Sequence, residues 1–91
     1  MNIEFTPHAW EDFNYWVKYD ETKVEKIRAL IRAIKQNPFK GIGNPEPLRH
    51  ELKGFWSRRI DHEHRLVYRL TGTKENDQKI LIIQCRFHYD L

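Results

Sequence analysis

The first 37 residues carry two stripes of apolar side chains at the spacing of amphipathic helices. The stripes consist of Ala9, Trp10, Phe13, Trp16 and Val17, followed by Val24, Ile27, Leu30, Ile31 and Ile34. Thr6-Pro7 is typical of a helix start, because a hydroxyl caps the first turn and proline suits its first position. We expect the first helix to end near Tyr19. Asp20 or Thr22 can cap the second, which Asn37-Pro38 ends.

Outside the helices, the apolar residues follow the two-residue period of strands. Asn2–Phe5 is a candidate first strand. Residues 55–60 and 64–70 alternate, and the short link through Asp61–Glu63 predicts a hairpin between them. A polar loop then leads to a last expected strand over residues 79–89.

The order of these elements predicts one α+β domain over residues 1–91, with the two N-terminal helices packed on one face of a mostly antiparallel β-sheet. Alternation would place Leu66, Tyr68 and Leu70 on one sheet face and Arg65 and Arg69 on the other.

Residues 38–48, PFKGIGNPEPL, interrupt both periodicities with three prolines and two glycines. Such a segment is neither a helix interior nor a central strand. Glu46 is its only acid and lies between Pro45 and Pro47, which restrict the backbone on both sides. The prolines either merely stiffen a crossing loop or hold a functional carboxylate in place, and rigid loops are common functional sites.

Composition narrows the class of protein. Hydrophobic residues make up 40% and aromatic residues 13% of the chain, which argues against disorder. The longest clean apolar run, Ile80–Ile83, is far shorter than the roughly 18 residues of a membrane span. Glu4 and His8 interrupt any signal-peptide core. The single cysteine, Cys85, cannot form an internal disulfide, so we expect a soluble, cytoplasmic protein.

The net charge is only +3, but its distribution is uneven. Residues 49–69 hold six bases, of which five are arginines and one is a lysine, against three acids. An arginine-rich patch is typical of phosphate recognition. A solvated strand face with ion pairs to the helices would have the same composition, so charge alone leaves both interpretations open.

Several kinds of active site are absent from the sequence. There is no glycine-rich phosphate loop and no G-x-S-x-G nucleophile motif. Cys85 lies in an apolar segment, which favours a small buried side chain over a nucleophile. His62-x-His64 lacks further ligands at zinc-site spacing, so we expect no metal site and no other cofactor.

The remaining glutamate, histidine and arginine residues suit the cleavage of RNA through its own 2′-hydroxyl. That reaction needs a base for the 2′ proton, an acid for the leaving 5′-oxygen and cations for the crowded phosphorane. Glutamate and histidine, with reference pKa values of about 4.3 and 6.5, suit the first two roles, and arginine suits the third. Composition alone does not choose the histidine, although His88, beside Tyr89 at the end of the last expected strand, is well placed.

Six motifs follow one another along the chain: EDFNYW, NPFKG, PEPL-x-H, GFWSRRI, EHRLVY and the closing CRFHY. Together they resemble the YoeB/Txe toxins of the RelE/ParE superfamily, over nearly the whole sequence. The resemblance implies the RelE-like, microbial-ribonuclease-like fold, which agrees with the fold class predicted from the residues.

The resemblance also implies partners and an activity. Members of the family are the toxins of type II toxin–antitoxin pairs, they cut mRNA in the ribosomal A site, and a Phd/YefM-type antitoxin neutralises them. Many are homodimers, and the aromatic residues of the first helix are a candidate contact. For at least two of Trp10, Phe13 and Trp16, however, we expect a place in the core.

The resemblance assigns roles to six residues of this chain. The family's general base falls on Glu46, its general acid on His88 and its transition-state arginine on Arg65. Further positions that contact phosphate or position the RNA fall on Arg49, Arg59 and Tyr89. Position 49 is often lysine in the family, so its charge is kept here but its reach differs.

Two other functions compete with the endoribonuclease. A ParE-like toxin would inhibit a protein target such as DNA gyrase without nuclease chemistry, but that branch lacks the combination of Glu46, Arg65 and His88. A plain RNA- or ribosome-binding module would need only the basic segment, and it gives no reason for a lone glutamate between two prolines.

Overall fold

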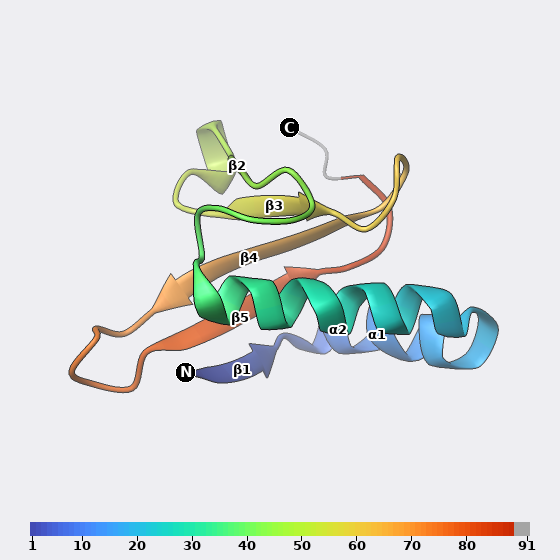
Figure 1. Ribbon diagram of the computed structural model, residues 1–91, viewed down its shortest axis with the longest axis horizontal. Coiled ribbons are helices and arrows are strands. Elements are labelled where there is room, and N and C mark those ends of the chain that lie inside the picture. Colours follow the sequence, from blue (N-terminus) through green and yellow to red (C-terminus); the bar gives the residue numbers. More distant parts are fainter. Residues whose placement is uncertain (89–91) are drawn as a thin grey trace.

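Two helices cover one face of a five-stranded sheet in the computed structural model, which describes residues 1–88 (Figure 1). Along the chain, the elements are β1 (Asn2–Phe5), α1 (Pro7–Tyr19), α2 (Glu21–Gln36), β2 (Glu46–Pro47), the 3₁₀ turn η1 (His50–Leu52), β3 (Trp56–Arg59), β4 (Arg65–Thr71) and β5 (Lys79–Gln84). No helix in this described part of the chain has the length and apolar character to span a membrane.

Both helices begin at the side-chain caps that the sequence predicts. Thr6 Oγ1 accepts a hydrogen bond from the Ala9 N–H at 3.2 Å, which satisfies a donor of the first turn of α1. Asp20 Oδ1 accepts from the Thr22 N–H at 3.1 Å, so Asp20 rather than Thr22 is the cap of α2.

The strand order is β1-β5-β4-β3-β2. The β2–β3, β3–β4 and β4–β5 pairs are antiparallel, and only β1–β5 is parallel, so the predicted mostly antiparallel sheet is confirmed. The β3–β4 hairpin is confirmed as well. The two-residue strand β2 was not predicted, because its proline excludes a central strand; it lies at the sheet edge, where proline is tolerated.

The last strand is shorter than predicted, since β5 ends at Gln84 instead of continuing to residue 89. At Cys85 both backbone groups bond to side chains of α1: the N–H donates to Asp12 Oδ2 at 3.1 Å, and the carbonyl accepts from Trp16 Nε1 at 2.8 Å. These bonds replace the sheet ladder and redirect the chain. Tyr89 lies outside the described residues.

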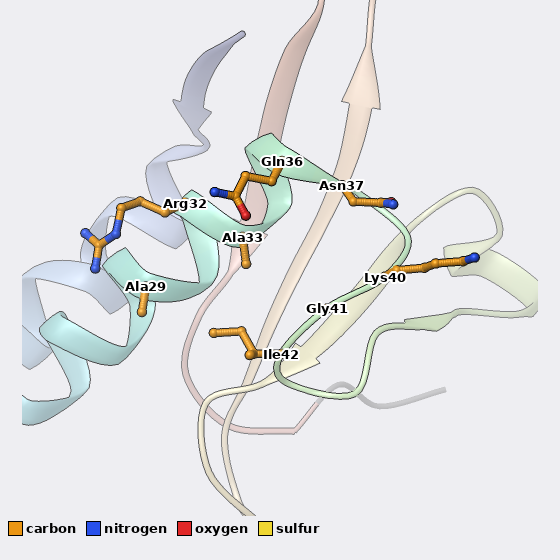
Figure 2. Close-up of a pocket in the computed structure, with 8 residues that line it drawn as sticks. All are labelled: Ala29, Arg32, Ala33, Gln36, Asn37, Lys40, Gly41 and Ile42. Atoms are coloured by element: carbon orange, nitrogen blue, oxygen red, sulfur yellow. The ribbon is translucent and has the colours of Figure 1, made fainter.

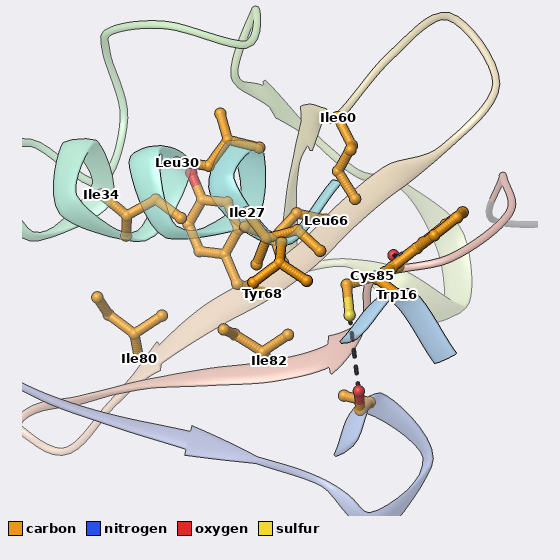
Figure 3. Packing of buried hydrophobic residues seen from close by; sticks show 12 residues of the cluster. Trp16, Ile27, Leu30, Ile34, Ile60, Leu66, Tyr68, Ile80, Ile82 and Cys85 are labelled. Atoms are coloured by element: carbon orange, nitrogen blue, oxygen red, sulfur yellow. Dashed lines mark hydrogen bonds between the residues drawn. The ribbon is translucent and has the colours of Figure 1, made fainter. Parts of the chain in front are cut away.

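The core lies between the helices and the central strands (Figure 3). Its fully buried side chains include Ile27 and Leu30 of α2 and Leu66 and Tyr68 of β4. We expected at least two of the three aromatic residues Trp10, Phe13 and Trp16 to lie in the core. Trp16 is buried and Phe13 packs against the core, which confirms this expectation. Trp10 is 51% exposed.

Arg58 is a fully buried cation on the core face of β3. Its guanidinium donates to the Tyr68 hydroxyl at 3.1 Å and to the carbonyl oxygens of Asn37, Lys40 and Ile42 at 2.7 to 3.0 Å. Tyr68 in turn donates to the Pro38 carbonyl at 2.6 Å. All the acceptors are neutral oxygens, and together they fasten the 37–42 segment to the sheet.

Two glycines allow this segment to approach Arg58. A Cβ at Gly41 would lie 3.1 Å from Nη1 of Arg58, and one at Gly43 would lie 3.0 Å from Cβ of Arg58. Both glycines also have a positive φ, of 124° and 85°, which other residues adopt only at a cost. The two glycines of the 38–48 segment are therefore needed for contact with the sheet.

We predict that Arg58→Met lowers the free energy of unfolding by at least about 3 kcal/mol, because it leaves several buried oxygens without a donor. Arg59→Met, which removes the neighbouring exposed cation, should change it by less than about 0.5 kcal/mol. Urea unfolding of both variants makes the comparison. Equal losses would show that the buried hydrogen bonds of Arg58 are not what stabilises the fold.

Candidate active site

A small polar pocket of about 130 Å³ lies on the sheet face opposite the helices. Its lining residues are Asn44, Glu46, Ser57, Arg59, Arg65 and His88. Four of these, Glu46, Arg59, Arg65 and His88, are predicted site residues from four separate segments of the sequence. The fold thus brings the candidate acid, base and two cations to one place.

Strand alternation explains how β3 contributes to this pocket. Ser57 and Arg59 point to the pocket face, whereas Arg58 between them points into the core. Antiparallel pairing then sets Glu46 of β2 directly opposite Ser57. The adjacent arginines of the WSRRI motif therefore have different roles, one in the core and one in the pocket.

Arg59 and Arg65 are paired directly opposite each other on β3 and β4. Like charges in this position destabilise a sheet pair, because their side chains share one face at short range. Both guanidinium groups line a pocket that holds a single carboxylate, Glu46. Such an arrangement attracts a group with more than one anionic oxygen, and arginine matches phosphate oxygens geometrically.

Glu46 is held from two sides. Pro45 and Pro47 restrict its backbone, and Asn44 Nδ2 donates to its Oε1 at 2.8 Å. Asn44 has a φ of 52°, in the left-handed region that asparagine tolerates better than most residues. Its backbone conformation turns its amide towards the carboxylate two residues later.

Arg65 is oriented by the tip of the β3–β4 hairpin. Its Nη1 donates to the carbonyl oxygens of Asp61 at 2.8 Å and His64 at 3.2 Å. A guanidinium carries five N–H donors, so these two bonds fix its direction and leave donors for an anion.

Asp61 stabilises the hairpin tip. Its Oδ1 accepts from the N–H groups of Glu63 at 2.8 Å and His64 at 2.7 Å, and its Oδ2 lies 3.2 Å from Lys23 Nζ on α2. Partial burial raises the pKa of Asp61, but the two N–H donors and the Lys23 ammonium outweigh this and hold the pKa below its usual value.

His88 follows a sharp turn after β5. Phe87 has a φ of 66°, which is rare for a bulky residue, and Gln84 Nε2 donates to its carbonyl at 3.3 Å. The same carbonyl accepts from the Arg65 N–H at 3.0 Å, which ties the turn to β4. This turn places His88 among the residues that line the pocket.

The remaining predicted residues lie elsewhere. Arg49 is exposed immediately before η1 and does not line the pocket, so its role in phosphate binding stays a prediction. Tyr89 is outside the described residues. Cys85 is buried, and burial raises the pKa of its thiol, in agreement with the prediction that it is not a nucleophile. Within residues 1–88, no three histidine, cysteine or acidic side chains are grouped as metal ligands.

A larger hollow of about 540 Å³ lies between α2 and the 37–42 segment. Figure 2 shows Arg32 and Lys40 leaving this hollow in opposite directions, so its two cations do not converge. The described residues that line it include no acid and no histidine. Size alone therefore does not identify the functional site, and the smaller pocket has the convergent polar groups.

Comparison with known proteins decides the family. The profile of YoeB-like toxins of bacterial type II toxin-antitoxin systems matches residues 5–89. Toxin YoeB of Streptomyces coelicolor is 48% identical over 89 residues, which are 98% of this chain and 100% of that relative. The chain belongs to the YoeB-like toxin family.

Solved structures confirm the fold predicted for this toxin. The YoeB/ParE toxin from Agrobacterium tumefaciens has a TM-score of 0.92 at 48% identity, over 98% of this chain and 100% of that one. The YoeB dimer from Staphylococcus aureus has a TM-score of 0.87 at 44% identity, over 98% of both chains. A chain of the heterotetrameric YoeB-YefM complex from the same organism has a TM-score of 0.85 at 44% identity, again over 98% of both.

Two pocket residues of the toxin, Asn44 and Ser57, were missed by sequence reasoning. Ser57 precedes the two arginines on a predicted strand, so its alternation with Arg59 was a usable signal. For Asn44, the only signal in the sequence was its position two residues before Glu46. Its amide is directed to the carboxylate by a left-handed backbone that the sequence does not reveal.

We predict that the stability of the toxin depends on pH through Asp61. A lowered pKa adds stability that is present above the unfolded value of about 3.9 and is lost as the pH falls through the folded value. The free energy of unfolding should therefore fall more steeply for the wild type than for Asp61→Asn as the pH is lowered from about 5 to about 2. Parallel curves would contradict this, and the exposed Glu75→Gln variant is the control.

Proposed function

We propose that this toxin is a ribosome-dependent endoribonuclease, an mRNA interferase that cleaves mRNA in the ribosomal A site and so inhibits translation. The observation that carries the proposal is the convergence of Glu46, Arg65 and His88 on one pocket, with Arg59 directly opposite Arg65. This set provides a base, an acid and two cations, of which Arg65 is held in place by hydrogen bonds.

The proposed reaction is an internal transesterification. Glu46 removes the proton of a ribose 2′-hydroxyl, and the 2′-oxygen attacks the adjacent phosphorus. His88 donates a proton to the 5′-oxygen as its bond to phosphorus breaks. The products are a 2′,3′-cyclic phosphate and a 5′-hydroxyl, so atoms and charge balance without an external nucleophile. The need for a 2′-hydroxyl restricts the substrate to RNA.

The two arginines stabilise the charge that develops on the phosphorane. Arg65 is pre-oriented by the carbonyl groups of Asp61 and His64, so little reorganisation is needed when phosphate binds. The repulsion between Arg59 and Arg65 in the free protein is relieved when an anion lies between them. Each preorganised group of this kind typically contributes about 10²- to 10³-fold in rate.

The shape of the site is consistent with dependence on the ribosome. Glu46, Arg59 and His88 are exposed, and the pocket is small, so the protein has few walls to orient a flexible RNA. Positioning of reactants accounts for a large part of catalysis. An mRNA already held in the A site would arrive with its backbone ordered.

We also propose that the toxin binds a Phd/YefM-type antitoxin and forms a homodimer. Among the similar structures are a YoeB dimer and a YoeB-YefM complex from Staphylococcus aureus. Trp10 is the candidate dimer contact, since it is half exposed and stacks on Phe13 with ring centroids 5.8 Å apart. An antitoxin segment that covers the arginines would block the pocket.

Cleavage of mRNA in a cell-free translation reaction tests the proposed function. The wild type should cut within ribosome-occupied codons and leave 2′,3′-cyclic phosphate and 5′-hydroxyl ends. Glu46→Gln and His88→Ala should still bind ribosomes but cut at least about 100-fold more slowly, because each removes a proton-transfer group. If translation stops without cleavage, or if both variants cut at the wild-type rate, a ParE-like or purely binding toxin becomes the better explanation.

A second prediction concerns Asn44. Asn44→Gly keeps the left-handed backbone but removes the donor to Glu46, so the carboxylate is no longer held in one direction. We expect cleavage to slow by about 10-fold with unchanged ribosome binding. Asp77→Gly, at another residue with positive φ, is the matched control and should cut at the wild-type rate. Equal rates for both variants would exclude a role for the Asn44 amide.

A further inference from the structure

His64 is a buried histidine that the proposed reaction does not use. It is 8% exposed and immediately precedes β4, and its ring lies between two aromatic side chains. The Trp16 ring contacts it edge-on, with centroids 4.8 Å apart, and the Phe87 ring lies on its other side at 5.9 Å. The packing alone would suit any flat apolar side chain.

One polar contact of His64 is not explained by packing. Its Nδ1 accepts a hydrogen bond from the backbone N–H of Phe87 at 2.7 Å. An imidazole nitrogen can accept only when it carries no proton, so the ring must hold its proton on Nε2. The Glu63 carboxylate, 3.6 Å from Nε2, favours this tautomer.

The Phe87 N–H lies within a strained turn. A left-handed conformation costs a residue with a bulky side chain roughly 1–2 kcal/mol, so something must hold it. Two sequence neighbours supply the bonds: His64 accepts from the Phe87 N–H, and Arg65 donates its N–H to the Phe87 carbonyl at 3.0 Å. Both backbone groups of Phe87 are thus bonded to the start of β4.

The next residue after this turn is His88, which lines the pocket together with Arg65. His64 is therefore the sequence neighbour of Arg65. It is also hydrogen-bonded to Phe87, which is the sequence neighbour of His88. Any movement of Phe87 changes the direction in which the chain leaves the turn. A displacement of about 1 Å of a catalytic group can cost about 100-fold in rate.

We propose that His64 is a positioning residue for His88. Its neutral Nδ1 holds the Phe87 amide, which keeps the turn left-handed and directs His88 into the pocket beside Arg65. His64 does not touch the substrate and transfers no proton. This inference rests on the proposed function, in which His88 is the general acid.

Two substitutions separate the acceptor of His64 from its packing. His64→Phe keeps a ring against Trp16 but has no acceptor for the Phe87 N–H. His64→Asn loses the ring but places its Oδ1 close to the position of Nδ1, so it can still accept. His62→Phe, the same change at an exposed residue of the hairpin tip, is the control.

Single-turnover cleavage on saturating amounts of ribosomes should slow by about 10- to 100-fold in His64→Phe, with no change in the ribosome concentration that gives half the maximal rate. His64→Asn should cleave close to the wild-type rate even if it is less stable. Amide hydrogen exchange at Phe87 should accelerate in His64→Phe only, while exchange at Ile82 stays slow in both. The opposite ranking of the two variants would show that His64 acts through packing and would overturn the proposal.

Two further results keep this test independent of the proposed function. If His88→Ala cleaves like the wild type, the general-acid assignment fails; if His88→Ala is inactive but His64→Phe cleaves normally, only the positioning role fails. Should His64→Phe not fold, nitrogen NMR of the wild-type ring at neutral pH decides. A proton on Nε2 with a bare Nδ1 supports the proposal, and a proton on Nδ1 excludes it.

Discussion

The buried guanidinium of Arg58 connects the parts of the molecule that carry function. A charge without water is costly unless hydrogen bonds replace its hydration. Here one hydroxyl and three carbonyl oxygens do so, and three of these four acceptors belong to the 37–42 segment. That segment leads directly to Asn44 and Glu46. The residue after Arg58 also holds it, since the N–H of Arg59 donates to the Gly43 carbonyl at 2.7 Å. The position of the candidate base therefore depends on a cation in the core.

The C-terminal turn depends on a second set of contacts. Asp12 and Trp16 of α1 hold the backbone of Cys85, and the start of β4 holds that of Phe87. Each bond takes a backbone group that the sheet no longer satisfies, which is how the strand can end and the chain can turn within four residues. Because α1 and β4 are themselves packed in the core, their hydrogen bonds to Cys85 and Phe87 restrict the movement of the turn. The positions of the candidate acid, His88, and the candidate base, Glu46, thus both depend on contacts with the core.

The pocket contains more positive than negative side chains. Arg59 and Arg65 face each other with one carboxylate nearby, at a cost to the stability of the free sheet. Backbone strain accompanies them at two positions, since Asn44 and Phe87 both have left-handed backbones. Functional sites often keep such unfavourable features, because a ligand or transition state relieves them or requires the geometry. A phosphodiester held between the arginines would relieve the repulsion.

Local patterns in the sequence were sufficient for the helices, the Thr6 cap, the hairpin and the fold class, because periodicity and capping depend on neighbours along the chain. For the second helix they left Asp20 and Thr22 open as caps, and the structure shows Asp20. Motif resemblance supplied Glu46, Arg59, Arg65 and His88, which the fold then gathered at one pocket. Other features depend on contacts between distant residues and were not predictable. These include the end of β5 at Gln84, the edge strand β2 and the amide of Asn44 on Glu46. The clearest case is Arg58-Arg59, two adjacent identical residues. The sequence determined that they lie on opposite faces of a strand; only the packing of α2 and the 37–42 segment decided which one is buried, because burial needs acceptors that come from elsewhere in the chain.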